Sequence, residues 1–132
     1  MTTFLSRAAI LAAVDLPRQT VPAPEWGGDV LMQGVTAKEW DDFEISLTVG
    51  KGKNQETNYR NLRARLVQKC VIDESGARLF SEADITALGG KSALVLERLF
   101  NVAKELSGRT DKDVEELTKN SEPGQSEGSP SA

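Results

Sequence analysis

The stretch at 70–84 constrains the fold more than any other, because it joins two helix patterns through a tight turn. Asp-Glu-Ser-Gly at 73–76 is a typical four-residue turn sequence. The short apolar runs at 71–72 and 79–80 flank this turn and can pair as a small hairpin. The apolar residues on both sides of the turn are therefore expected to share one core.

The helix that follows this turn carries a clear start signal. Ser81 is expected to be its N-cap, with Asp84 three residues later reaching back to the cap. Phe80 and Ile85 occupy the two positions of a hydrophobic staple, which fixes the angle at which the chain enters the helix.

Three further segments, at 36–48, 56–70 and 91–107, place apolar residues at helical spacing. The first opens with a capping box of Thr36 and Glu39. The apolar positions are Trp40, Phe43 and Leu47 in the first segment, Tyr59, Leu62, Leu66 and Cys70 in the second, and Leu96, Leu99, Phe100, Ala103 and Leu106 in the third.

The N-terminal part is expected to contain a short helix at 6–14, capped by Ser6, and a β-hairpin at 18–34. Prolines in the first strand of the hairpin cannot donate to a central ladder, so this strand is expected at a sheet edge. A last helix is expected to begin after Thr110, which can pair with Asp113 as a cap.

The composition excludes several kinds of active site. The chain has no histidine and one cysteine, so it cannot form a Ser-His-Asp triad, a Cys-His pair or an internal disulfide. No metal or cofactor is expected, because 73–84 lacks the glycine and final glutamate of a calcium loop and 50–55 lacks P-loop spacing. The net charge of −4 disfavours nucleic acid and anionic membranes.

These patterns predict an α+β fold, with a small N-terminal β-hairpin region followed by a mainly helical bundle. Residues 1–120 are expected to form a single domain. Residues 121–132 consist of Ser, Glu, Gly, Pro and Gln with one terminal Ala, and such a segment cannot bury enough apolar surface to order itself. We therefore expect a disordered tail. No apolar run reaches the roughly 20 residues that span a bilayer, so a soluble cytoplasmic protein is expected.

Truncation after Asn120 is expected to leave the melting temperature within about 2 °C of the full chain, because surface changes rarely exceed about 0.5 kcal/mol. Thermal melts of the two proteins, followed by circular dichroism, measure this. A clearly larger fall would show that the tail docks on the domain.

Four residues are candidate contacts for a protein partner: Trp26, Trp40, Arg63 and Phe100. Trp26, beside two glycines, suits either exposed recognition or a cover over the hairpin. Arg63 falls inside the apolar stripe of its helix, where its charge needs an acidic partner or water. The stripes at 56–70 and 91–107 either offer an apolar groove to a helical partner or face each other in the core.

Several short motifs occur in a recognisable order. They are Pro-Glu-Trp-Gly-Gly at 24–28, Asn-Leu-Arg-Ala-Arg-Leu-Val at 61–67, Ile-Asp-Glu-Ser-Gly at 72–76, Leu-Phe-Ser at 79–81, Leu-Ser-Gly at 106–108, Asp-Val-Glu-Glu-Leu at 113–117 and Lys-Asn at 119–120. This series resembles the tail assembly chaperones of long-tailed (siphovirus-type) bacteriophages, from about residue 5 to residue 120. The chain departs from the expected pattern at Gln33, where a basic residue would follow the second strand.

The resemblance implies a protein that binds the phage tape measure protein, keeps it soluble and assists polymerisation of the tail tube around it. It implies no enzymatic activity, no catalytic residues and no cofactor. Further implied partners are the tail tube protein, a frameshifted longer form of the chain and other copies of itself. The implied location is the cytoplasm of the infected bacterial host, with the protein absent from the mature virion.

The residues alone leave an alternative, a small regulatory or adaptor domain that binds one folded protein partner, or DNA. An enzyme that uses only carboxylates is a distant third. A chaperone would load several copies on one extended client, whereas a regulator would bind at a fixed ratio.

Overall fold

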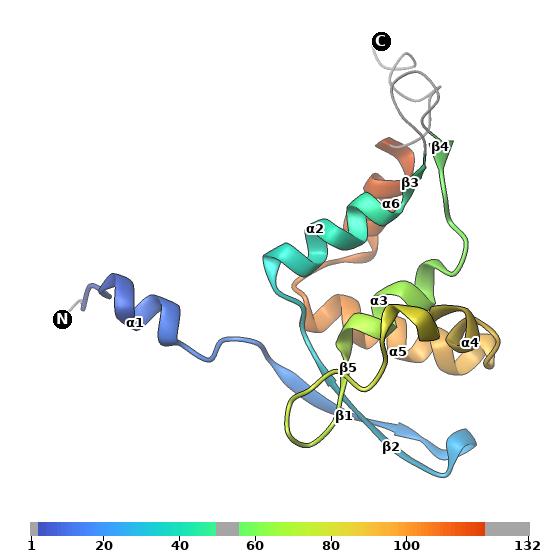
Figure 1. The fold of residues 1–132 in the computed structure, drawn as a ribbon, viewed down its shortest axis with the longest axis horizontal. Helices are drawn as coiled ribbons and strands as arrows, with labels where there is room; N and C mark the ends of the chain where they lie inside the picture. Colours follow the sequence, from blue (N-terminus) through green and yellow to red (C-terminus); the bar gives the residue numbers. More distant parts are fainter. Residues whose placement is uncertain (1–2, 50–55, 121–132) are drawn as a thin grey trace.

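The computed structural model describes residues 3–49 and 56–120, and the structural statements below concern this part of the chain (Figure 1). A small antiparallel sheet near the N-terminus precedes a mainly helical part, which confirms the predicted α+β class. The loop at 50–55 and the tail at 121–132 lie outside the described residues. The elements are α1 (Arg7–Ala12), β1 (Arg18–Ala23), η1 (Pro24–Trp26), β2 (Gly28–Gln33), α2 (Ala37–Ser46), β3 (Thr48–Val49), β4 (Glu56–Thr57), α3 (Leu62–Cys70), β5 (Val71–Ile72), η3 (Glu82–Asp84), α4 (Ile85–Gly89), α5 (Ala93–Leu106) and α6 (Asp111–Asn120).

The predicted hairpin is formed by β1 and β2, which pair antiparallel along their whole length, from Arg18 opposite Gln33 to Ala23 opposite Gly28. The sheet order is β1-β2-β5, so the strand that contains proline is at an edge, as predicted. The short η1 turn joins the two strands, and Gly27 closes it with φ of 84°, a conformation that favours glycine.

The core lies between the sheet and the helices. The apolar stripes of α3 and α5 face each other, and most of their residues are buried in this core. In α2, Trp40 and Phe43 are buried with ring centroids 5.1 Å apart. Other buried members of this core are Val21, Met32, Leu47, Leu66, Val67, Cys70, Leu88, Val95, Leu96, Leu99, Phe100 and Ala103.

The junction at 70–84 partly follows its prediction. The turn closes at Gly76, and the backbone N–H groups of Ser75 and Ala77 donate to the Asp73 carboxylate at 2.8 and 3.1 Å. The expected hairpin is reduced to one isolated bridge between Ile72 and Arg78. Two backbone bonds close it, from the N–H of Asp73 to the carbonyl of Ala77 at 2.8 Å and from the N–H of Leu79 to the carbonyl of Val71 at 3.1 Å, while the other edge of β5 pairs with β2.

Most predicted helix starts are confirmed by their hydrogen bonds. Thr36 and Glu39 form the capping box of α2, at 2.8 and 3.1 Å. The N–H of Ser81 donates to Asp84 at 2.8 Å, and Ser6 accepts from the N–H of Ala9 at 3.1 Å. These contacts satisfy N–H groups that a helix start otherwise leaves without a partner. The same reciprocal pattern links Thr110 and Asp113 at the start of α6.

The predicted helix at 56–70 begins six residues too early. Residues 56–57 pair with β3 as β4, and α3 starts only at Leu62, after Asn61 with φ of 56°. The side chain of Asn58 accepts from the N–H of Arg60 at 3.1 Å, which holds the chain in a turn. Tyr59 therefore lies outside the helix and is 39% exposed, so the buried stripe starts at Leu62.

The longest described helix is α5, as predicted, and Gly108 follows it with φ of 73°. None of the described helices is long and apolar enough to cross a bilayer.

Candidate protein-binding site

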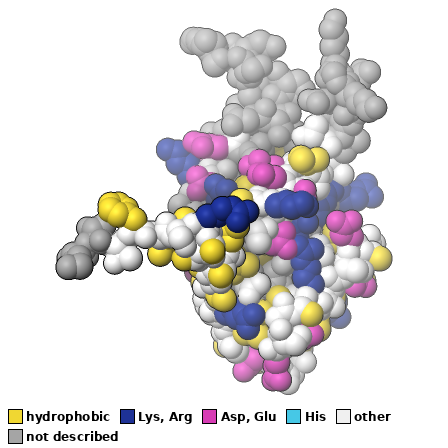
Figure 2. Space-filling model, turned by 60° about the vertical axis from the view of Figure 1, so that its left-hand side comes forward, with side chains coloured by type: hydrophobic (Ala, Val, Ile, Leu, Met, Phe, Trp, Pro, Cys, Tyr) yellow, Lys and Arg dark blue, Asp and Glu magenta, His cyan; other side chains and the backbone are white. Residues whose placement is uncertain are grey.

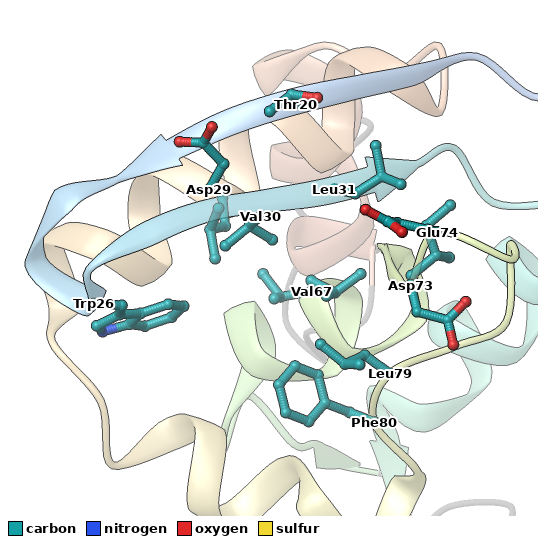
Figure 3. Close-up of a pocket in the computed structure, with 13 residues that line it drawn as sticks. Thr20, Trp26, Asp29, Val30, Leu31, Val67, Asp73, Glu74, Leu79 and Phe80 are labelled. Atoms are coloured by element: carbon teal, nitrogen blue, oxygen red, sulfur yellow. The ribbon is translucent and has the colours of Figure 1, made fainter.

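A groove of about 520 Å³ opens beside β2, between the hairpin tip and the loop that follows β5 (Figure 3). The exposed fractions of Trp26 and Leu79 are 38% and 56%, so apolar groups at this groove are accessible to a partner. The apolar residues labelled around it in Figure 3 are Trp26, Val30, Leu31, Val67, Leu79 and Phe80.

The groove exists because β5 is only two residues long. It pairs with Leu31 and Met32 of β2, and the chain then turns away at Asp73. The first half of β2, 28–30, therefore has β1 on one side and no strand on the other within the described residues. Val67 of α3 and Leu99 of α5 line the groove from the core side.

The hairpin tip beside the groove is held by an ion pair. The guanidinium of Arg98 on α5 donates to both carboxylate oxygens of Glu25, at 2.8 and 2.7 Å, and to the carbonyl of Pro22 at 3.3 Å. These bonds fix the turn that carries Trp26 against α5. The hydrogen bond from Arg98, followed by one from the backbone N–H of Glu25, lowers the pKa of Glu25 from 4.5 to about 2.

This ion pair predicts a pH dependence with a definite sign. Because the pKa of Glu25 is lowered in the folded state, its contribution to stability is full above pH 4.5 and is lost as pH falls toward 2. Between about pH 5.5 and pH 2.5, the urea midpoint of Glu25→Gln is therefore expected to fall less than that of the unchanged protein. Equal falls in the two proteins would show that the pair adds no stability.

The rim of the groove is acidic. Three acids line it together with Thr20: Asp29 of β2, and Asp73 and Glu74 of the loop after β5. No Lys or Arg is among its described lining residues. Neither Asp29 nor Glu74 forms an ion pair within the described part of the chain. Two acids at the rim therefore have their charges available to a partner.

The structure does not bring the four candidate contact residues together. Trp26 lines the groove, whereas Arg63 lies on another face, paired with Glu97 and 5.8 Å from the centre of the Phe100 ring. Of the two alternatives that the sequence leaves for this charge, an acidic partner or water, the structure provides Glu97 as the partner, with the Arg63 side chain half exposed. Trp40 and Phe100 are only 3% and 4% exposed, so they belong to the core and not to the surface. Partner binding by Trp26 and Arg63 stays a prediction.

Comparison with known proteins identifies the family. The sequence profile of the family described as "Phage tail assembly chaperone" matches residues 6–120. The chain belongs to this family. The solved structure of the bacteriophage HK97 tail assembly chaperone is similar in fold, with a TM-score of 0.56, 19% sequence identity, and coverage of 77% of this chain and 93% of that chain. No curated protein sequence gives a significant match.

A second apolar surface of this tail assembly chaperone is its N-terminal arm, which we define as residues 4–14. Figure 1 shows α1 projecting away from the rest of the fold, and none of its residues is buried. In Figure 2, hydrophobic side chains gather on and beside this arm. The large exposed apolar residues of the arm are Phe4, Leu5, Ile10, Leu11 and Val14, at 56–97% exposed.

The chaperone's groove is lined by apolar and acidic side chains, which suit it to binding, and Cys70 is not among the described lining residues. Cys70 is buried in the core, and burial raises the pKa of its thiol to about 12, so it is a packing residue. Within residues 3–49 and 56–120, no group of three His, Cys, Asp or Glu residues could hold a metal ion.

Sequence analysis identified Trp26 at this site but missed Leu79 as an exposed contact and missed the three acids. Leu79 was expected to share one core with the apolar residues on the other side of the turn, but its side chain is 56% exposed. The signal that could have found this site is the short apolar run at 71–72, because in the described part of the chain no other strand pairs with residues 28–30 of β2 on that side.

Proposed function

We propose that this chaperone binds the tape measure protein of its phage, keeps it soluble and assists polymerisation of the tail tube around it. The observation that carries the proposal is the family match over residues 6–120. The accessible apolar side chains of the groove and of the arm support it, because a protein that holds an aggregation-prone client needs such surfaces.

The remaining parts of the proposal follow from the same family. The protein acts without enzymatic activity in the cytoplasm of the infected host and leaves before the virion is complete. Its further partners are the tail tube protein and a frameshifted longer form of the chain. The tail at 121–132 is the point at which an added C-terminal module would join the 1–120 domain.

Co-expression with the tape measure protein, followed by affinity purification and light scattering, tests the proposal. We expect a complex whose mass corresponds to several copies of the chaperone per client, because an extended client offers repeated binding positions. An adaptor for one folded partner would give a fixed one-to-one complex instead. A tape measure protein that purifies without the chaperone bound would contradict the proposal.

A further inference from the structure

The groove beside β2 combines three features that together describe its occupant. Its walls are apolar, its rim is acidic, and one wall is a strand edge that has no neighbouring strand among the described residues. We infer that the groove binds a positively charged, apolar segment of the client, which lies extended along residues 28–30 of β2. The inference rests on the proposed function, since it takes the client to be the source of the segment.

The unpaired edge argues for an extended segment. β5 runs antiparallel to β2 but stops at Ile72, opposite Leu31, and the chain then leaves the sheet. A strand placed beyond Ile72 would continue the line of β5 along 28–30. Strand edges bind extended peptides through main-chain hydrogen bonds, and neighbouring pockets select alternate side chains. The outer edge of β1 is less suitable, because Pro22 has no N–H to donate.

The apolar walls argue for large hydrophobic side chains at alternate positions. Figure 3 shows Trp26 and Phe80 on either side of the space beneath Val30, with Leu79 beside Phe80. Trp26 is held there by the ion pair of Glu25 with Arg98, so this wall is fixed before a partner arrives. A preformed apolar wall lowers the ordering cost of binding.

The rim charges argue for a basic segment. Asp29 and Glu74 are exposed and form no ion pair within the described chain, whereas Arg98 pairs with Glu25 and Arg78 pairs with Glu39. The guanidinium of Arg18 lies against Gly76 in the turn that carries Glu74, but it donates to Gln33. Lysine or arginine side chains that alternate with apolar ones would meet these acids as the apolar side chains enter the groove. A negatively charged segment would be repelled.

The test uses the full chain and three labelled peptides. The first, Lys-Val-Lys-Leu-Lys-Val-Lys, has alternating basic and apolar residues; the second replaces every lysine by glutamate; the third replaces the central leucine by proline. Fluorescence anisotropy measures their affinities. We expect the first peptide to bind at least about tenfold more tightly than the other two, and its affinity to fall as salt is added.

Two exposed leucines give a matched pair of variants. Leu79→Asp, in the groove, is expected to weaken binding of the first peptide at least about tenfold, while Leu94→Asp, on α5 and outside the groove, leaves it within about twofold. The double variant Asp29→Lys, Glu74→Lys is expected to reverse the preference between the basic and acidic peptides. Because both acids are exposed, this variant tests the groove even if Leu79→Asp fails to fold.

Several results would overturn the inference. If the basic and acidic peptides bound equally well, or if the double variant Asp29→Lys, Glu74→Lys had no effect, the acidic rim would not select a basic segment. If the proline peptide bound as tightly as the first peptide, the segment would not bind as an extended strand along β2. Tighter binding of a peptide with the sequence of residues 3–14, together with a mass that rises with concentration, would show that the occupant is a second copy. If the client remains soluble with the Leu79→Asp variant, the inference fails while the proposed function stands.

Discussion

Replacing Phe43 by alanine is expected to lower the free energy of unfolding by about 3–5 kcal/mol, the usual cost of removing a buried phenylalanine. Phe43 is 0% exposed and its ring packs against Trp40, so the substitution leaves a cavity between α2 and the rest of the core. A cavity of this kind closes only partly, because the surrounding helices are held in place by other contacts.

Urea unfolding of Phe43→Ala measures this loss, and Ile45→Ala provides the control. Ile45 lies two residues away on the same helix but is 70% exposed, so its substitution is expected to cost less than about 0.5 kcal/mol. If the two variants unfold at similar urea concentrations, α2 does not pack through the face that the structure assigns.

Replacing Gly34 by alanine is expected to cost about 3 kcal/mol, at the upper end of the range for overpacking. A Cβ atom at Gly34 would lie 2.3 Å from the carbonyl oxygen of Leu106, at the end of α5. The obstacle is backbone, so it cannot be relieved by rotating a side chain. The end of β2 would have to separate from α5, and the hydrogen bond from the N–H of Val35 to Ser107 at 3.3 Å would be strained.

Gly28→Ala is the matched control, because Gly28 lies at the other end of β2, where an added Cβ would have no described residue within 4 Å apart from its chain neighbours. Its stability is expected to stay within about 0.5 kcal/mol of the unchanged protein. Thermal and urea unfolding of both variants give the comparison. Equal stability of Gly34→Ala and Gly28→Ala would mean that β2 and α5 do not approach as closely as described.

Local signals predicted the helix starts well. Thr36 with Glu39, Ser81 with Asp84 and Thr110 with Asp113 each place a side chain three residues from its partner, so the prediction needs no knowledge of the rest of the fold. The stripe of α5 was predicted for the same reason, since its apolar residues repeat at helical spacing over a long segment.

Features that depend on distant contacts were predicted less well. The segment at 56–61 has a helical pattern, but Arg65 of α3 donates to the carbonyls of Ser46 and Asn58, both at 2.9 Å, and stabilises the turn before the helix. Similarly, β5 pairs along one edge with β2, which is far away in the chain, and a single bridge links it to the run that follows its own turn. The spacing of residues in the sequence carries no information about the Arg65 hydrogen bonds or about the pairing of β5 with β2.

The candidate site was the least predictable part. The sequence singles out Trp26 as a large aromatic residue beside two glycines, but its position across the groove from Phe80 depends on where β5 ends. Trp40 and Phe100 carried the same kind of aromatic signal and are buried instead. A stripe of apolar residues does not show by itself whether the fold covers it.

The most direct test of the proposed function is the soluble fraction of the tape measure protein of the same phage, measured by ultracentrifugation and light scattering after expression with and without this chaperone. An unrelated acidic protein of similar size, expressed at the same level, is the control. The proposal predicts that the client aggregates alone and with the control, and remains soluble only with the chaperone. A client that is equally soluble in all three cases, or equally aggregated, would contradict it.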